Sequence, residues 1–293
     1  MTIVGVHGVG KYRYYAETGS VGGAAERMRV KWNRYLHAGL YGPDAPYTGE
    51  SYVTEIAYYA HLLTGGERPA PSREVSRMEP EERLVAAAWL KQLGIERLGL
   101  GRLDEVRAAA GETLTGLLRR LAGWAVERLG ERADDIAATF VPEVAAYFAG
   151  DRAAARVKAC DALADTMRRR QPRVLIAHSL GSVVAYETLW ANPDIEIELL
   201  ITLGSPLGMR NVVFERLLPT PVGGRGRRPP NAGRWVNIAD KDDIVAIPPA
   251  LGDRFDGVDL DVTVNLDWID FHTVEKYLGS GALNEHLKKY LAA

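Results

Sequence analysis

Short apolar runs alternate along this chain with segments whose apolar residues recur every three to four positions. The apolar, β-branched runs predict strands at residues 2–6, 52–59, 173–177, 197–203, 234–239 and 261–265. Helical patterns fill most of the intervals between these runs. Such alternation is typical of a mostly parallel sheet flanked by crossover helices. The sequence therefore predicts the α/β fold class.

Three of the helical patterns have recognisable ends. The first covers residues 22–39, and we expect it to close at Gly39. The second covers residues 78–94, with acidic residues and a proline in its first turn and a glycine at its end. The third covers residues 151–170 and leads directly into a predicted strand.

The segment 62–132 departs from the alternating pattern because it contains no convincing strand. Within it, residues 113–130 place a row of leucines on one helical face. We expect a helical insertion within a single domain that spans residues 1–293. Its apolar face would most simply pack on that domain. The functional alternatives are a lid, a membrane-touching helix and a subunit interface. A subunit interface would mean that the protein forms a homo-oligomer.

Composition narrows the class of protein. The 293 residues are 47% hydrophobic and 25% charged, with a net charge of -2, which is ordinary for a globular protein and gives no argument for nucleic acid as a partner. No apolar run is long enough for a transmembrane segment. The chain opens on a strand with no pattern of a signal peptide, so we expect a cytoplasmic protein.

The chain has a single cysteine, Cys160, so neither an internal disulfide nor a cysteine-based metal cluster can form. It shares the apolar face of its helix with Val157, Ala164 and Met167. We expect a buried packing residue, since nothing nearby in sequence would lower the pKa of its thiol and make it a nucleophile.

The most informative stretch is "RVLIAHSLGSVVAYETLW". A strand ends at Ala177, Ser179 follows within a sharp turn, and a helix begins beyond it. This is the nucleophile-elbow pattern, with alanine in the first glycine position. The strained turn demands tiny neighbours two residues before and after the serine, and Ala177 and Gly181 meet that demand. The alternative is a serine that merely caps a helix.

A serine nucleophile needs a base and an orienting acid, which in this architecture follow it in the order Asp, His. A later strand runs into a loop with three candidate acids, Asp240, Asp242 and Asp243. His272 then stands in a loop just before a helix. The other downstream histidine, His286, lies among lysines in the last helix, and we expect it to be exposed.

The opening stretch "TIVGVHGVGKYRYY" allows two interpretations. The spacing from Gly5 to Lys11 fits a phosphate-binding loop, but Tyr12 stands where that loop needs Ser or Thr to hold magnesium. Alternatively, its glycines bring backbone amides close to a reacting carbonyl. In that case we expect His7 to shape the turn and Lys11 to lie at the pocket rim or in solvent.

Five pieces together resemble the α/β-hydrolase superfamily, close to lipase-like serine hydrolases that include bacterial lipases and inositol-deacylase-type esterases. They are "VHGVG", "AHSLGS", "LLITLGSPLG", "WVNIADKDDIVA" and "FHTVEKYL". They touch both ends of the chain and most predicted strands, but not the insertion. The resemblance implies an α/β-hydrolase fold trimmed at its N-terminal edge, because many members have two strands before the "HG" strand. Its Asp-x-Val pattern favours Asp243 as the acid.

The resemblance implies a serine esterase that acts on a lipid or another acyl ester or thioester, with no metal or organic cofactor. Ser179 would attack the carbonyl, His272 would accept its proton and Asp243 would orient the imidazole. The backbone amide of Leu180, and by resemblance that of Val9, would form the oxyanion hole. A serine peptidase, an acyltransferase and a non-catalytic scaffold or sensor remain alternatives. The sequence leaves the substrate and its acyl-chain preference open.

Overall fold

The computed structural model describes residues 1–46, 52–63, 78–98, 131–149, 154–266 and 272–291. Its central sheet has the order β2-β1-β3-β4-β6-β8, and every neighbouring pair is parallel. The strands are β1 (Thr2–Val6), β2 (Val53–Ala57), β3 (Val174–His178), β4 (Ile197–Leu203), β6 (Ala232–Asp240) and β8 (Leu260–Val264). All six predicted strands are confirmed, with ends within two residues. A separate pair, β5 (Gly226–Arg227) and β7 (Phe255–Asp256), was not predicted.

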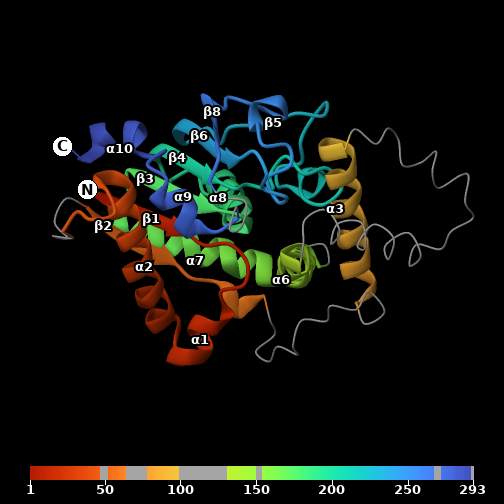
Figure 1. Cartoon of the computed structure of the whole chain (residues 1–293), viewed down its shortest axis with the longest axis horizontal. Coiled ribbons are helices and arrows are strands. Elements are labelled where there is room, and N and C mark those ends of the chain that lie inside the picture. Colours follow the sequence, from red (N-terminus) through yellow and green to blue (C-terminus); the bar gives the residue numbers. More distant parts are fainter. Residues whose placement is uncertain (47–51, 64–77, 99–130, 150–153, 267–271, 292–293) are drawn as a thin grey trace, which may run out of the picture.

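Helices cover both faces of the sheet, so the α/β class is confirmed (Figure 1). The described helices are α1 (Tyr12–Thr18), α2 (Val21–Tyr41), α3 (Pro80–Leu98), α6 (Glu131–Phe148), α7 (Ala154–Arg170), α8 (Leu180–Ala191), α9 (Val274–Gly279) and α10 (Asn284–Leu291). Short 3₁₀ turns lie at Ala60–Leu62, Phe214–Arg216 and Leu251–Asp253.

Alternate residues of each strand enter two separate hydrophobic clusters. Val4 of β1 and Leu175 of β3 pack with α6, α7 and α8. Their sequence neighbours Ile3 and Ile176 point the other way and pack with α2, α9 and α10. Because side chains alternate across a strand, near-continuous apolar runs are what a sheet covered on both faces requires.

The predicted insertion, residues 62–132, is described in part. Within it, helix α3 packs on the hydrophobic core through Val85 and Trp89, and it continues to Leu98 instead of stopping at Gly94. Figure 1 shows α3 beside α6, on the side of the molecule away from both chain ends. The predicted helix over residues 113–130 lies outside the described residues. Helices α1 and α6 were not predicted.

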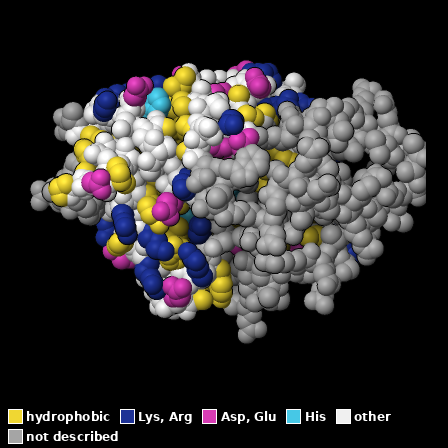
Figure 2. All heavy atoms as spheres, viewed as in Figure 1, with side chains coloured by type: hydrophobic (Ala, Val, Ile, Leu, Met, Phe, Trp, Pro, Cys, Tyr) yellow, Lys and Arg dark blue, Asp and Glu magenta, His cyan; other side chains and the backbone are white. Residues whose placement is uncertain are grey.

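Charged side chains of both signs share the described surface. Figure 2 shows Lys and Arg side chains gathered over α1 and α2, with acidic side chains between them. On these two helices, Arg27 pairs with Glu17 and Arg29 pairs with Glu26. None of the helices in the described ranges combines the length and apolar composition needed to cross a membrane.

Gly39 is not the end of its helix, which corrects the prediction from sequence. Helix α2 continues to Tyr41, and Gly42 follows it with a φ of 101°. A Cβ atom at Gly39 would lie 2.0 Å from the carbonyl oxygen of Leu278 in α9. This glycine is therefore a packing contact, which lets α9 approach α2 and places the segment just after His272.

We expect Gly39→Ala to lower the free energy of unfolding by about 1–3 kcal/mol, because the new methyl group must displace backbone of α9. Gly22→Ala is the matched control, since its Cβ would meet nothing within 4 Å. This control should be neutral or stabilising by up to about 1 kcal/mol, through helix propensity. Urea denaturation followed by circular dichroism measures both, and equal effects would contradict the packing role of Gly39.

Candidate active site

Ser179 lies in a strained turn between β3 and α8. Its φ of 55° and ψ of -131° fall outside the regions that L-residues favour, and the residue is almost fully buried. A Cβ atom at Gly181 would lie 2.5 Å from the carbonyl oxygen of His7 and 2.6 Å from that of Val6. Gly181, two residues after the serine, therefore has to lack a side chain, because the end of β1 approaches it closely.

The turn after β1 reaches Ser179 through a second glycine. A Cβ atom at Gly8 would lie 2.5 Å from Ser179 Cβ, so any side chain there would displace the serine. The turn that holds Val9 therefore directly adjoins Ser179. Leu180 opens α8, where the first backbone N–H groups have no partner within the helix. That the amides of Val9 and Leu180 face a bound carbonyl stays a prediction.

His7 shapes this turn, as predicted. Its Nδ1 donates to the carbonyl of Gly8 (2.8 Å), and its Nε2 accepts from the backbone N–H of Tyr59 (3.1 Å). The Tyr59 hydroxyl donates back to the carbonyl of His7 at 2.7 Å, and the two rings stack. Burial lowers the pKa of His7 to about 3, so its ring is neutral and can fill both hydrogen-bond roles at once.

The structure brings together the three side chains predicted as a triad. His272 precedes α9, and its Nδ1 donates to Asp243 Oδ2 at 2.7 Å. Its Nε2 lies 2.9 Å from Ser179 Oγ and can accept the hydroxyl proton. The three residues come from separate loops that follow β3, β6 and β8. A relay of this geometry can raise the nucleophilicity of a serine hydroxyl.

Among the three candidate aspartates, Asp243 is the one whose carboxylate meets His272. Its other oxygen, Oδ1, accepts from the backbone N–H groups of Val245 and Ala246. Asp240 has a different role, since its carboxylate accepts backbone N–H groups in the loop after β6 and in the segment that follows β8. Asp242 pairs with Lys241.

Sequence reasoning missed Tyr277, a fully buried residue of α9. Its hydroxyl donates to Asp243 Oδ2 at 2.8 Å and accepts from the backbone N–H of Asp240 at 2.8 Å. Asp243 Oδ2 therefore receives two donors, His272 and Tyr277. The sequence indicates this role only weakly, because an aromatic residue on the helix after His272 fits core packing equally well.

His178, the residue before the serine, is buried beside His272, with ring centroids 5.0 Å apart. Burial, followed by the nearby His272, lowers the pKa of His178 well below its ordinary value. A neutral His178 ring places no positive charge beside His272.

Lys11, expected at the pocket rim or in solvent, is half-buried, and burial lowers the pKa of its ammonium group. It directly precedes α1, and its backbone carbonyl accepts from the Tyr58 hydroxyl. The prediction for His286 was wrong. His286 is buried instead of exposed, because α10 turns it inward together with Leu287 and Tyr290.

Cys160 is half-buried against the core, as its packing role predicts. Its Sγ lies 3.6 Å from the Tyr147 hydroxyl, and burial raises the pKa of the thiol to about 11. The thiol is therefore protonated near neutral pH, which argues against a nucleophilic role. Val157, expected on the same buried face, is 45% exposed.

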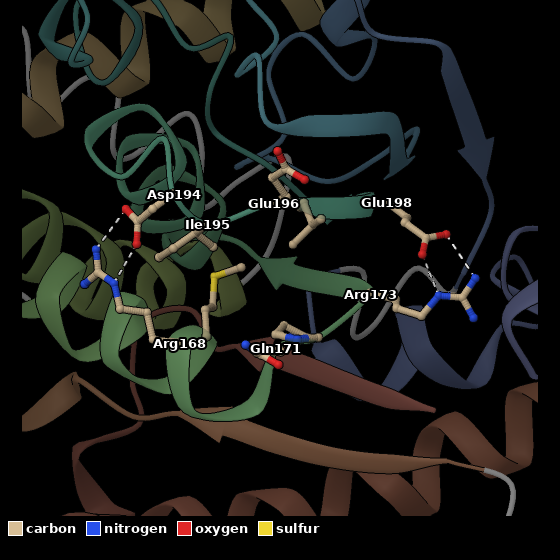
Figure 3. Close-up of a pocket in the computed structure, with 10 residues that line it drawn as sticks. Arg168, Gln171, Arg173, Asp194, Ile195, Glu196 and Glu198 are labelled. Carbon is tan, nitrogen blue, oxygen red and sulfur yellow. Dashed lines mark hydrogen bonds and ion pairs between the residues drawn. The ribbon is translucent and has the colours of Figure 1, made fainter.

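A groove of about 600 Å³ lies at the opposite edge of the sheet, where β3 and β4 begin (Figure 3). Two ion pairs flank it, Arg168 with Asp194 and Arg173 with Glu198, and Glu196 lies between them. Both arginines are thus engaged by carboxylates. Because Ser179 follows the other end of β3, this groove is separate from the candidate site.

Within the described ranges, no group of three or more His, Cys, Asp or Glu side chains is arranged to hold a metal ion. Comparison of the chain with protein-family models, curated proteins and solved structures found no match. The assignment of a function therefore depends on the geometry of the site.

We expect Tyr277→Phe to lower the free energy of unfolding by about 1–3 kcal/mol, because two buried partners, Asp240 N–H and Asp243 Oδ2, each lose a hydrogen bond. Tyr290→Phe is the matched control. It is equally buried, and its hydroxyl has no hydrogen-bond partner among the described residues. Urea denaturation should show little change for this control. A similar loss in both variants would argue that general packing, and not the Asp243 contact, explains the effect.

Proposed function

We propose that this protein is a serine hydrolase of the α/β-hydrolase type that cleaves a carboxylic ester. The single observation that carries the proposal is the position of His272, which bridges Asp243 Oδ2 at 2.7 Å and Ser179 Oγ at 2.9 Å. The strained serine turn between a central parallel strand and a helix also supports it.

The proposed reaction begins with attack of Ser179 Oγ on the ester carbonyl while His272 Nε2 takes the hydroxyl proton. Asp243 holds the imidazole with Nδ1 protonated and stabilises the positive charge that forms. The tetrahedral intermediate collapses, and His272 gives its proton to the departing alcohol. Water, deprotonated by the same imidazole, then attacks the acyl-enzyme and releases the acid and free Ser179.

The negative oxygen of the tetrahedral intermediate needs donors that are already in place. We assign this role to the backbone amides of Leu180 and Val9. The first stands at the N-terminus of α8, which favours negative charge, and the second follows Gly8, which abuts the serine. Acyl esters of lipids and acyl thioesters are the substrate classes that this chemistry serves. A peptidase or an acyltransferase would use the same groups.

A fluorophosphonate probe tests the proposed nucleophile. We expect covalent labelling of the wild type and none of Ser179→Ala, because the probe reacts with an activated serine hydroxyl. Ser280→Ala, at the exposed end of α9, serves as the control and should label like the wild type. Intact-mass spectrometry measures the adduct, and equal labelling of Ser179→Ala would refute the proposed function.

A pair of isosteric variants tests the proposed acid. We expect Asp243→Asn to lower kcat for an aryl ester by roughly a thousandfold or more, because the amide cannot hold the imidazole in the required tautomer. Asp240→Asn should lower kcat far less, since the bond to His272 comes from Asp243 and the new amide still accepts one of the two backbone N–H groups that Asp240 binds. Initial rates across a series of ester and thioester chain lengths give both values. A larger loss in Asp240→Asn would move the acid to Asp240.

A further inference from the structure

Helix α6 is fastened to the turn beside the serine by a buried carboxylate. Both oxygens of Glu143 accept from the backbone N–H of Gly10, at 3.1 and 3.0 Å, and the side chain is 1% exposed. Gly10 lies two residues beyond Gly8 in the turn that abuts Ser179. The contact joins residues 133 positions apart in the chain.

A second contact of α6 reaches the same glycine. Gly10 has a φ of 75°, and a Cβ atom there would lie 2.9 Å from Thr139 Cγ2. Thr139 and Glu143 are four residues apart and therefore share one face of α6. This face of α6 closes on Gly10, whose N–H meets the carboxylate.

Helix α3 makes the corresponding contact with the loop that carries the acid. The indole N–H of Trp89 donates to the carbonyl of Ile244 at 2.8 Å, and Trp89 is fully buried. Ile244 directly follows Asp243. Since the rings of Trp89 and Phe140 are 6.1 Å apart, α3 and α6 also pack on one another.

The Glu143 contact buries a carboxylate. A buried carboxylate is costly unless hydrogen bonds and an opposite charge compensate it, and a charge-assisted hydrogen bond is stronger than a neutral one. Gly10 N–H supplies one such hydrogen bond. The Glu143 carboxylate also acts to raise the pKa of the neighbouring Lys11, against the larger lowering by burial. If this position served packing alone, an uncharged side chain would suffice.

We propose that α3 and α6 act as a positioning pair, in which Glu143 fixes the turn that holds Val9 and Trp89 fixes the loop that holds Asp243. The effect of this pair of helices on turnover rests on the proposed function. The described part of the insertion then has a definite role, because its helix α3, together with α6, sets the geometry of two loops that meet at Ser179.

Glu143→Ala and Glu143→Gln separate positioning from packing. We expect Glu143→Ala to lower kcat for an aryl ester by about 10- to 100-fold, with KM changed less than threefold, because a misplaced donor is felt mainly in the transition state. Glu143→Gln should keep kcat within about fivefold, since its amide oxygen still accepts from Gly10. Trp89→Phe, which keeps an aromatic ring but loses the N–H, should lower kcat without loss of the folded state.

Asp261→Ala is the matched control. That carboxylate also accepts backbone N–H groups, those of Leu251 and Gly252, but in the connection between β6 and β8. It should leave kcat within threefold of the wild type. Where Glu143→Ala proves too unstable to assay, Glu143→Asp, shorter by one methylene, gives the folded variant, and a wild-type kcat in it would overturn the proposal.

Hydrogen exchange of the peptide that contains Gly10 tests the anchor without any substrate. We expect faster exchange there in Glu143→Ala and no change in Asp261→Ala. Faster exchange in a protein whose wild type turns over no ester would support the anchor and reject the proposed function. Wild-type exchange together with wild-type kcat in Glu143→Ala would overturn the positioning role, as would equal losses of kcat in the Ala and Gln variants.

Discussion

The close approach of two turns constrains the rest of this molecule. Strands β1 and β3 pair in parallel and in register, so the turns that follow them emerge side by side. Each turn fits only because the other carries a glycine at the contact: Gly8 faces Ser179, and Gly181 faces the carbonyls of Val6 and His7. The strained backbone of Ser179 persists because packing on both sides leaves it no room to relax.

Burial then assigns different roles to the three histidines around this contact. His7 and His178 are held neutral, mainly because their charged forms would be desolvated. His272 differs by having the Asp243 carboxylate as a partner at 2.7 Å. The same ring type thus serves as a turn-forming bridge at His7 and as a proposed proton carrier at His272. The division follows from their neighbours and not from any intrinsic property of the ring.

Much of the framework was readable from the sequence because it is encoded locally, as in the apolar runs that identified all six strands of the main sheet. Contacts across long stretches of chain were not. Tyr277 meets Asp243 from 34 residues away, and Trp89 meets Ile244 from 155 residues away. Gly39 has the sequence signature of a helix end, yet its lack of a side chain serves the contact with α9. Likewise, the path of the loop after β6 decides among the three candidate acids, and no spacing rule encodes that path.

These long-range hydrogen bonds all run from a helix to a loop at the candidate site. The strands and the helices therefore contribute differently to the site. The parallel sheet places the ends of β1, β3 and β6 at one edge, but parallel pairing cannot fix the conformation of the loops beyond those ends. Hydrogen bonds from outside the sheet supply what is missing: Glu143 binds the first loop, while Tyr277 and Trp89 bind the loop around Asp243. Because these three side chains are buried, breaking any of the bonds leaves a buried polar group short of a partner, and that cost keeps the loops in place. The helices α3, α6 and α9 therefore do more than cover the sheet, since they complete the geometry that the strands begin.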